Sequence, residues 1–431
     1  MIVNPVFLYE KPDLFFIHLA IKGQNAYFAV LKLIMTMRLN WTRSILVFSA
    51  AVVLATSCTK PEFSKDEPLI EEQQDNLYII SDGNILYALN PKTGAVRWKY
   101  HDLRGMPWEP LALDGYVFVV VPKNVLKLDA RNGKVVDSFF ALSATVTDYS
   151  VLGPVIGQGN YVYVPYSITQ TGSGTTNNLA QFDHTIAGAP KTPLNFSTPI
   201  PTGLPSVPVL PTSPLILGNK MLIPWQAKLD LVQIAPTAPL AWSNTGANPN
   251  NPVTDGQVVY VCSGSLLGAF DLNTGVQLWS YNAGDFISTS PIVFGRNVIF
   301  GCEDNKLYCI DPDAQAPRWI FETNERIYGS PFAYDQTVYF GGNDHHFYAL
   351  NIIDGSVKWK YRTGALIRSS PIVYKGMVYI GSYDQTMYAF DTSGALRWKH
   401  ALNNLINQSP VLYDAEAKVG VYPAVSGLSA Q

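Results

Sequence analysis

The sequence predicts an all-β fold, an eight-bladed β-propeller made of four-stranded antiparallel blades. The first observation is a recurring proline that opens an apolar run, and the later prolines lie about 40 residues apart: Pro110, Pro154, Pro214, Pro252, Pro291, Pro331, Pro371 and Pro410. The second is that most of these runs lead through two more strand-like segments to an Asp or Asn, a Gly turn and a Trp. A period near 40 with four short strands per unit is typical of propellers.

The clearest repeat runs from Ser370 to Trp398 and shows why each segment is a strand or a turn. Pro371 begins the first strand, where a missing backbone N–H is tolerated. Residues 377–382 alternate as a second strand, residues 386–391 form the third, and residues 395–400 the fourth. The turns between them contain Gly, Asp or Ser, which favour tight reversals of the chain.

The two ends of the repeat region together predict one further blade. Residues 77–100 supply three strands with no proline-led strand before them, and residues 410–413 supply an opening strand with nothing after it. Pairing of these pieces would close the ring, so the propeller is expected to span residues 77–431. Residues 419–426 are a leftover strand-like run, which either competes with residues 77–81 or lies outside the ring.

The turn between the third and fourth strands carries a repeated Gly and Trp. Glycine supplies the positive φ that such a turn needs, and the indole supplies a large apolar face. The residues assigned to joints between blades are Gly94, Gly275, Gly355, Gly394, Trp98, Trp279, Trp319, Trp359 and Trp398. This pattern resembles the docking motif of the pyrroloquinoline-quinone-type propeller repeat, and the resemblance implies that each Trp packs against the neighbouring blade.

The stretch 165–213 interrupts the regular repeat. It is rich in Pro, Thr, Gly, Ser and Asn, and its prolines are expected to prevent regular strands over much of its length. It is either a binding loop carried on a rigid scaffold or a tolerated surface insertion.

The N-terminal segment predicts export and lipidation. Residues 37–57 have a basic start, an apolar run of 45–55 and small residues before Cys58, as in a secretory signal peptide. The cysteine after these small residues resembles a bacterial lipobox, which implies a lipid on Cys58. Residues 1–36 are interpreted as an over-extended start, and the charged residues 58–76 as a flexible tether. A signal peptide with a chance cysteine is the alternative.

Composition and motifs argue against several classes of function. The 431 residues carry a net charge of −3, so no basic excess is present to hold nucleic acid phosphates. Quinone-dependent dehydrogenases share the docking motif, but they also have adjacent paired cysteines, a calcium site and a catalytic Asp, which are not recognisable here. His345 and His346 fall in a turn and lack further ligands. We therefore expect no cofactor, no metal and no catalytic residue.

Candidate binding residues lie just before the opening prolines, where the chain should face the entrance of the central funnel. They vary between blades while the framework repeats, so specific recognition could be located there. The alternative is an ordinary solvated rim. The candidates are Trp108, Glu109, Asp285, Arg326, Tyr328, Arg368 and Asn407.

The signal peptide, lipidated cysteine, short tether and repeat together resemble the propeller lipoproteins of the outer-membrane β-barrel assembly machinery, its B subunit. The resemblance implies a monomeric, non-catalytic scaffold that is anchored to an envelope membrane by lipid and docks partner proteins on a propeller face. The alternatives are a quinone- or metal-dependent periplasmic dehydrogenase and a surface binder of polysaccharide or peptide.

Overall fold

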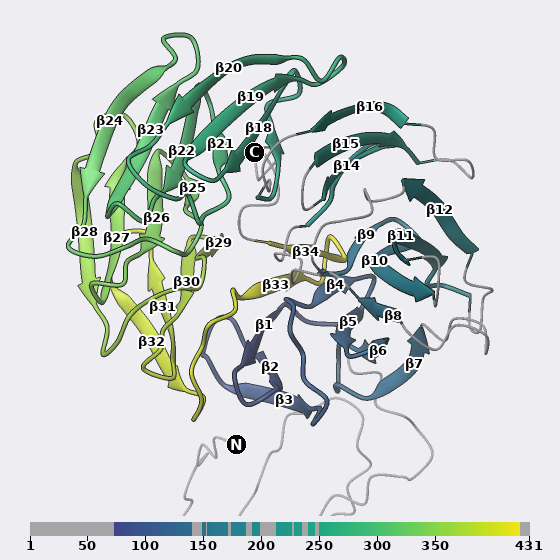
Figure 1. Ribbon diagram of the computed structural model, residues 1–431. Coiled ribbons are helices and arrows are strands. Elements are labelled where there is room, and N and C mark those ends of the chain that lie inside the picture. The colour runs from purple at the N-terminus through teal and green to yellow at the C-terminus, as the bar shows by residue number, and fades with distance from the viewer. Residues whose placement is uncertain are drawn as a thin grey trace, which may run out of the picture. The chain divides into compact units, whose positions relative to one another are not determined.

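The computed structural model describes residues 73–139, 149–151, 153–170, 174–186, 192–198, 213–225, 228–234, 240–245 and 250–422. The chain divides into a unit spanning Met1–Ile70, which lies outside these residues, and a unit spanning Glu71–Gln431. All regular elements in the described ranges are β-strands, and they form antiparallel sheets that are mostly four-stranded (Figure 1). The predicted all-β class is therefore confirmed.

Four consecutive sheets are regular, and each takes the name of the proline that precedes its first strand. In each of them four antiparallel strands follow one another in chain order. The Pro252 sheet contains β17 (Val253–Thr254), β18 (Val258–Ser263), β19 (Leu266–Asp271) and β20 (Gln277–Asn282). The Pro291 sheet contains β21 (Ile292–Phe294), β22 (Asn297–Gly301), β23 (Lys306–Asp311) and β24 (Ala316–Glu322). The Pro331 sheet contains β25 (Phe332–Tyr334), β26 (Thr337–Gly341), β27 (His346–Asn351) and β28 (Val357–Arg362), and the Pro371 sheet β29 (Ile372–Tyr374), β30 (Met377–Gly381), β31 (Thr386–Asp391) and β32 (Leu396–Ala401).

The two ends of the repeat region meet in one nine-stranded sheet. Its Pro410 part contains β33 (Val411–Asp414), β1 (Asn76–Ser81), β2 (Ile85–Leu89) and β3 (Val96–His101). Its Pro110 part contains β4 (Leu111–Leu113), β5 (Tyr116–Val121), β6 (Asn124–Asp129) and β7 (Val135–Phe139). Strands β33 and β1 are antiparallel, with Leu412 opposite Leu77.

Strand β34 (Val419–Val421) joins the two parts of this sheet, which the sequence did not predict. It pairs with β33 on the side away from β1, and Val419 lies opposite Leu113 of β4. The hydroxyl of the next residue, Tyr422, accepts a hydrogen bond from the Ala112 backbone N–H. The segment therefore neither competes with β1 nor lies outside the sheets, because the free edges of β33 and β4 both offer it unpaired backbone groups.

The Pro154 sheet corrects the prediction for 165–213. It contains β8 (Tyr149–Val151), β9 (Ile156–Gln158) and three longer strands, β10 (Tyr161–Gln170), β11 (Gly174–Asp183) and β12 (Thr192–Thr198). Pro165 lies inside β10, opposite Leu179. On the other side of β10, β9 pairs up to Tyr163 and β8 begins at Tyr166, so Pro165 falls in the gap between them. A missing N–H costs no ladder bond there.

The Pro214 sheet contains β13 (Leu215–Leu217), β14 (Lys220–Trp225), β15 (Lys228–Gln233) and β16 (Leu240–Thr245). The repeat motif is weak in this part of the sequence, yet the sheet has the same strand order as the regular sheets. Residues 229–232 of β15 are all buried, including Asp230, whose carboxylate pairs with Lys228 at 2.7 Å.

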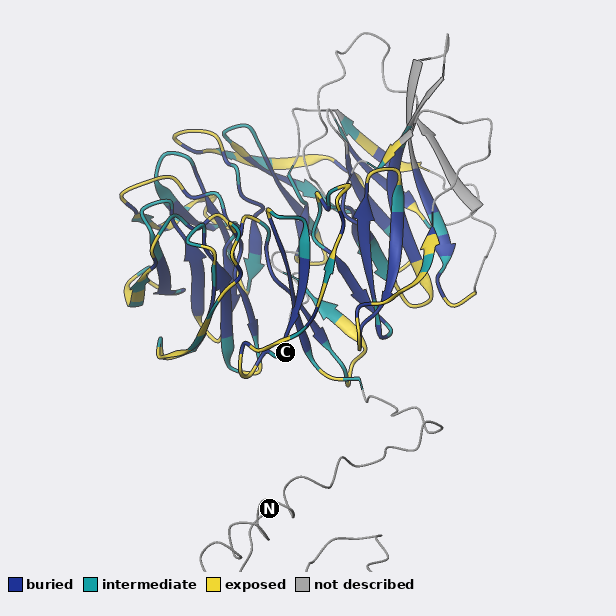
Figure 2. Cartoon of the chain, turned by 90° about the horizontal axis from the view of Figure 1, so that it is seen from below, coloured by how far each residue is buried: buried dark blue, intermediate teal, exposed yellow. Residues whose placement is uncertain are grey.

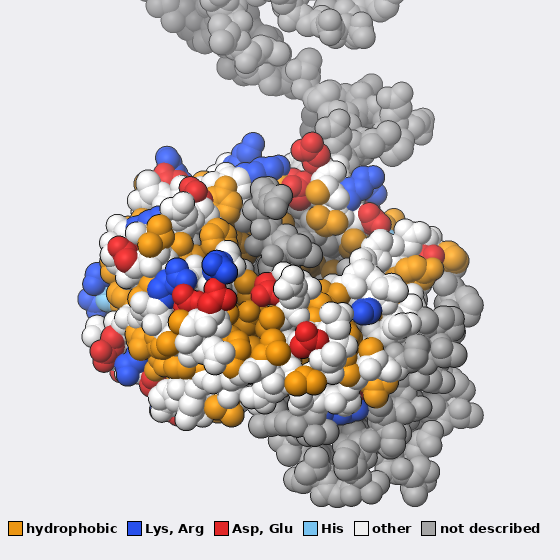
Figure 3. All heavy atoms as spheres, turned by 90° about the horizontal axis from the view of Figure 1, so that it is seen from above, with side chains coloured by type: hydrophobic (Ala, Val, Ile, Leu, Met, Phe, Trp, Pro, Cys, Tyr) orange, Lys and Arg blue, Asp and Glu red, His pale blue; other side chains and the backbone are white. Residues whose placement is uncertain are grey.

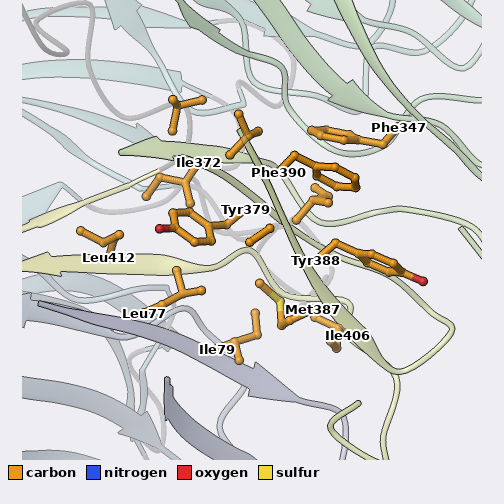
Figure 4. Close-up of a cluster of buried hydrophobic side chains, with 14 of the residues drawn as sticks. Leu77, Ile79, Phe347, Ile372, Tyr379, Met387, Tyr388, Phe390, Ile406 and Leu412 are labelled. Atoms are coloured by element: carbon orange, nitrogen blue, oxygen red, sulfur yellow. The ribbon is translucent and has the colours of Figure 1, made fainter. Parts of the chain in front are cut away.

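The core lies between the sheets, because neighbouring sheets cover both faces of the inner strands. Strands such as β22, β26 and β30 are almost wholly buried, whereas the fourth strand of each regular sheet is largely exposed (Figure 2). One cluster joins the Pro331, Pro371 and Pro410 sheets through Phe347, Phe390, Tyr379, Leu412 and Leu77 (Figure 4). The opening strands of neighbouring sheets also contact one another, in the order β17, β21, β25, β29, β33, β4 and β9.

Tryptophans connect one sheet to the next at five places. In each case the indole Nε1–H donates to a backbone carbonyl in the following sheet's last turn, at 2.9 or 3.0 Å: Trp98 to Ala130, Trp242 to Leu272, Trp319 to Ile352, Trp359 to Thr392, and Trp398 to Pro91. The Trp398 bond links the Pro371 sheet to the Pro410 sheet. Trp242 is a joint that the sequence analysis did not identify.

A glycine faces the indole at each of these joints. Gly94 has φ of +70°, and a Cβ on it would lie 2.5 Å from the Trp398 ring. Gly275, Gly355 and Gly394 have the same relation to Trp242, Trp319 and Trp359. Trp279 differs from these five. In the sheet that follows it, the turn between β23 and β24 has Gln315 in place of the glycine, at φ of 53°, and Trp279 Nε1 has no hydrogen-bond acceptor among the described residues. The joint therefore lacks both the glycine and the hydrogen bond that the other five joints have.

Candidate functional site

A relay of serines holds the connections between sheets close to the axis. The backbone N–H of Ser290 donates to Ser330 Oγ at 2.9 Å, that of Ser330 to Ser370 Oγ at 2.9 Å, and that of Ser370 to Ser409 Oγ at 3.0 Å. Each serine directly precedes an opening proline, so the same position of successive repeats is placed side by side. The relay therefore fixes the position of each of these connections relative to the next.

Glu109 occupies the corresponding position before Pro110. The backbone N–H of Ser409 lies near its carboxyl group and lowers its pKa, so Glu109 follows Ser409 around the same ring of connections. Burial raises the pKa of Glu109, and the hydrogen bonds from its own N–H and from Ser409 oppose that shift less strongly. A carboxyl group thus stands at the end of a neutral hydrogen-bonded series.

A buried isoleucine holds each of these four connections to the core. Ile287, Ile327, Ile367 and Ile406 lie four residues before their prolines and have no exposed surface. The residue that follows each of them is Ser288, Tyr328, Arg368 or Asn407, and all four line one central cavity. The fold therefore presents a different side chain from each sheet at one equivalent position.

Two of the predicted rim residues are held by a carboxylate that the sequence analysis did not identify. Arg326 Nη1 lies 3.0 Å from Glu303 Oε2, and the Tyr328 hydroxyl donates to the same oxygen at 3.3 Å. Glu303 directly precedes the turn residue Asp304 between β22 and β23, so only the fold brings it to the rim. Its place just before the turn aspartate is the sequence signal that marks it.

Arg368 and Asn407 continue this series through a second residue that was missed, Tyr383. The guanidinium of Arg368 lies 4.7 Å from the centre of the Tyr328 ring and 5.5 Å from that of Tyr383. The Tyr383 hydroxyl donates to Asn407 Oδ1 at 2.8 Å. Tyr383 precedes the turn residue Asp384, as Glu303 precedes Asp304. We call the six residues Glu303, Arg326, Tyr328, Arg368, Tyr383 and Asn407 the rim ladder.

The other candidates do not join the rim ladder. The Asp285 carboxylate accepts the neighbouring Phe286 N–H and is exposed. Trp108 is partly buried against the apolar cluster of the Pro110 and Pro154 sheets, and its buried Nε1 has no partner among the described residues. The structure therefore brings together four of the seven predicted rim residues, with Glu109 close by in the cavity wall.

The central cavity has a volume of about 410 Å³. Its wall includes the relay serines, Tyr328, Arg368 and Asn407 of the rim ladder, and Tyr422; among the described residues that line it, only Glu109 and Arg368 are charged. This volume lies within the range of about 300 to 1,000 Å³ that is usual for small-molecule sites.

The cysteines and the possible metal ligands outside the cavity do not form a second site among the described residues. Cys262, Cys302 and Cys309 are buried free thiols, and burial raises the pKa of Cys302 to about 11 and that of Cys309 to about 12. No group of three or more His, Cys, Asp or Glu side chains suited to a metal occurs within the described ranges. Among the same residues, no helix is long and apolar enough to cross a membrane. Cys58 lies outside the described residues.

The outer surface mixes charges of both signs. Arg318 pairs with Asp311 at 2.6 Å, and Arg296 with Asp313 at 3.0 Å. Figure 3 shows one face, on which Lys and Arg side chains lie beside Asp and Glu side chains with apolar groups between them. Exposed pairs of this kind contribute little to the stability of the fold.

The chain is similar to several solved structures. The computationally designed Ika8 protein matches with a TM-score of 0.56 and 13% identity, over 74% of this chain and 98% of its own. The quinohemoprotein alcohol dehydrogenase ADHIIG from Pseudomonas putida HK5 matches with a TM-score of 0.54 and 12% identity, over 73% and 68%. BamB from Moraxella catarrhalis matches with a TM-score of 0.41 and 14% identity, over 81% and 91%. At these identities the first two likenesses show the fold alone.

Sequence comparison identifies the family. The comparison with curated proteins gave no match. A family model described as outer membrane protein assembly factor BamB matches residues 59–186 and 263–409, which is more than half of the chain. The chain therefore belongs to the BamB family of outer membrane protein assembly factors.

Proposed function

We propose that this protein is a non-catalytic scaffold of the cell envelope that docks partner proteins on the axial rim of a propeller. The family description, an outer membrane assembly factor, supports both the envelope location and the use of protein partners. In this proposal the partners are envelope proteins, the scaffold acts as a monomer, and no cofactor takes part.

The proposed scaffold is a closed ring of eight blades. Its closure is supported by the pairing of β33 with β1 and by the hydrogen bond from Trp398 to Pro91, which joins the last regular sheet to the first. Closure matters for docking, because it fixes the positions of rim residues that come from distant parts of the chain.

The observation that carries the docking proposal is the rim ladder. Its arginines and tyrosines are residue types that dominate binding at protein interfaces. They are also held in place before any partner arrives, because Arg326 is paired to Glu303 and Arg368 is stacked beside two rings. Pre-ordered side chains lose less conformational entropy on binding. Phe286, 42% exposed, and Leu405, 38% exposed, add apolar surface near the ladder.

The proposed attachment to the membrane is a lipid on Cys58 followed by the tether 58–76. Replacing Cys58 with Ala should release the protein from membranes to the soluble fraction. Membrane association that is unchanged in this variant would contradict the anchor, while leaving the docking surface untouched.

The docking proposal is tested by photo-crosslinking in the native envelope. A photoreactive residue at Leu405, beside the rim ladder, is expected to capture one or a few membrane proteins. The matched control is the same residue at Lys399, which is exposed on the outer strand β32. Failure to capture any protein at Leu405, or equal capture at both positions, would overturn the proposal. An absorbance change after addition of quinone and Ca²⁺ would instead favour the dehydrogenase alternative.

A further inference from the structure

We infer that the central cavity is a binding site for a small zwitterion, an amino acid or dipeptide, in addition to the partner docking proposed for the rim. The site combines three features of the wall: a cation with unused donors, a row of hydroxyl groups, and a carboxyl group. These groups come from the connections before Pro331, Pro371, Pro410 and Pro110, which the fold brings to one cavity.

Arg368 supplies the cation. It forms no ion pair or hydrogen bond with any of the described residues, and its contacts are the faces of Tyr328 and Tyr383. Stacking on two rings holds the plane of the guanidinium but leaves its N–H edge free, which is the arrangement that suits a carboxylate. A carboxylate in the cavity would satisfy donors that the folded chain leaves unused.

The relay serines add donors to the same wall. The oxygens of Ser330, Ser370 and Ser409 each accept a backbone N–H from the preceding connection, so each keeps its own hydroxyl proton for another partner. Within the described part of the chain these three protons have no acceptor. The wall therefore offers hydroxyl donors beside the guanidinium, which favours a ligand rich in acceptor oxygens.

Glu109 supplies the opposite charge. It is the only acidic residue among the described residues of the cavity wall, and in chain order it lies beyond Ser409, at the other end of the series from Ser290. A ligand ammonium group placed there would favour the ionised form of this partly buried carboxyl group. One cation and one anion in a single cavity of about 410 Å³ thus match a ligand that carries one group of each sign.

The experiment measures binding of L-alanyl-L-alanine to the purified full chain by calorimetry and by the shift in melting temperature. Two analogues lack one charge each: the N-acetyl dipeptide lacks the ammonium, and the dipeptide amide lacks the carboxylate. The unmodified dipeptide is expected to raise the melting temperature, since a ligand that binds only the folded state stabilises it. Both analogues should bind about tenfold more weakly, as expected for loss of one charge-assisted contact.

Two variants assign the charges to the residues. Arg368→Gln should weaken dipeptide binding about tenfold and should no longer distinguish the dipeptide from its amide. Glu109→Gln should no longer distinguish the dipeptide from its N-acetyl analogue. Arg296→Gln is the matched control, because Arg296 pairs with Asp313 on the outer surface and is not among the residues of the cavity wall, so its dipeptide binding should stay at the wild-type value.

The inference is overturned if the dipeptide produces neither heat nor a thermal shift, if both analogues bind as well as the dipeptide, or if Arg368→Gln binds like the wild type. Circular dichroism monitors folding of each variant. Should Glu109→Gln weaken the relay and unfold, the exposed Arg368 still decides the matter together with the two analogues.

Discussion

The framework between the sheets and the axial rim follow opposite rules. At the framework positions the same residue type returns in sheet after sheet, as the tryptophans, their facing glycines and the relay serines show. At the axial position three residues before the proline the side chain changes each time, from Ser288 to Tyr328, Arg368 and Asn407. Repetition therefore marks residues that hold the sheets together, and variation marks the positions at which we propose recognition.

The strongest way to break the framework is at the joint between the last and first sheets. Trp398→Ala removes the indole that donates to Pro91 and packs against Gly94. Trp398 is partly buried, so we expect a loss of about 3 kcal/mol in the free energy of unfolding, at the lower end of the range for buried aromatic side chains. Urea unfolding measures it. Trp279→Ala is the control, since Trp279 lacks both partners, and an equal loss in the two variants would contradict this account of the joint.

A smaller change tests the space beside the same indole. In Gly94→Ala the new Cβ would lie 2.5 Å from the Trp398 ring, at a φ of +70°. The expected loss is roughly 2 to 3 kcal/mol, because overpacking adds to the cost of the backbone conformation. Gly264→Ala has a similar φ of +59° and open space, so it measures the backbone cost alone. Thermal unfolding should rank Gly94→Ala as clearly the worse of the two.

Removing one hydroxyl of the relay should cost less. Ser409→Ala deletes the oxygen that accepts the Ser370 N–H and leaves that buried donor without a partner. The free energy of unfolding should fall by about 1 to 2 kcal/mol. Ser393→Ala, an exposed turn hydroxyl, serves as the control for the loss of a serine. Equal effects from both would show that the relay is not a structural device.

The first connection differs from the later ones in its use of charge, which predicts a pH effect. Asp102 directly follows β3, at the position that Thr323 and Thr363 occupy after β24 and β28. Arg104 donates hydrogen bonds to the Asp102 carboxylate, and these lower the pKa of Asp102 to about 2. A lowered pKa stabilises the fold above the unfolded value of about 4 and ceases to do so as the pH falls through about 2. Asp102→Asn should therefore lose roughly 1 kcal/mol at pH 7, and the difference from wild type should vanish near pH 2. Acid unfolding curves of both proteins provide the measurement.

The irregular joint offers the smallest effect, and it should be stabilising. Gln315 holds a positive φ in the turn where other sheets have glycine. Gln315→Gly should raise the free energy of unfolding by about 0.5 to 1 kcal/mol by relieving this conformation. Comparing the cost of Trp279→Ala in the Gln315→Gly background with its cost in the wild type shows whether the glycine allows the indole to dock. If Trp279→Ala costs no more in the Gln315→Gly background than in the wild type, the joint has not been restored.

The sequence was sufficient for the features that repeat. Prolines, turn glycines and tryptophans act locally and in the same way in each sheet, so their period predicted the sheets and four of the five hydrogen-bonded Trp joints. Features that depend on the free edge of another strand were not predictable. Pro165 is tolerated only because two short strands leave a gap opposite it, and β34 forms because two strand edges are open. Trp242 escaped notice because the motif around it is degenerate.

The candidate site shows the same division. Position before a proline was enough to select Arg326, Tyr328, Arg368 and Asn407, because the repeat sets where that position lies. Glu303 and Tyr383 were missed, since each lies in a turn between the second and third strands and reaches the rim only through folding. Partners that come from different turns cannot be read from spacing along one chain.

Partner capture and stability, both measured on one rim variant, separate the proposed role of the rim from the structural role of the framework. Arg326→Glu reverses the charge of an exposed ladder residue that pairs with Glu303. We predict that native pull-down loses the envelope partners while the urea unfolding midpoint changes little. Unchanged capture by this variant, with the protein still folded, would contradict the account.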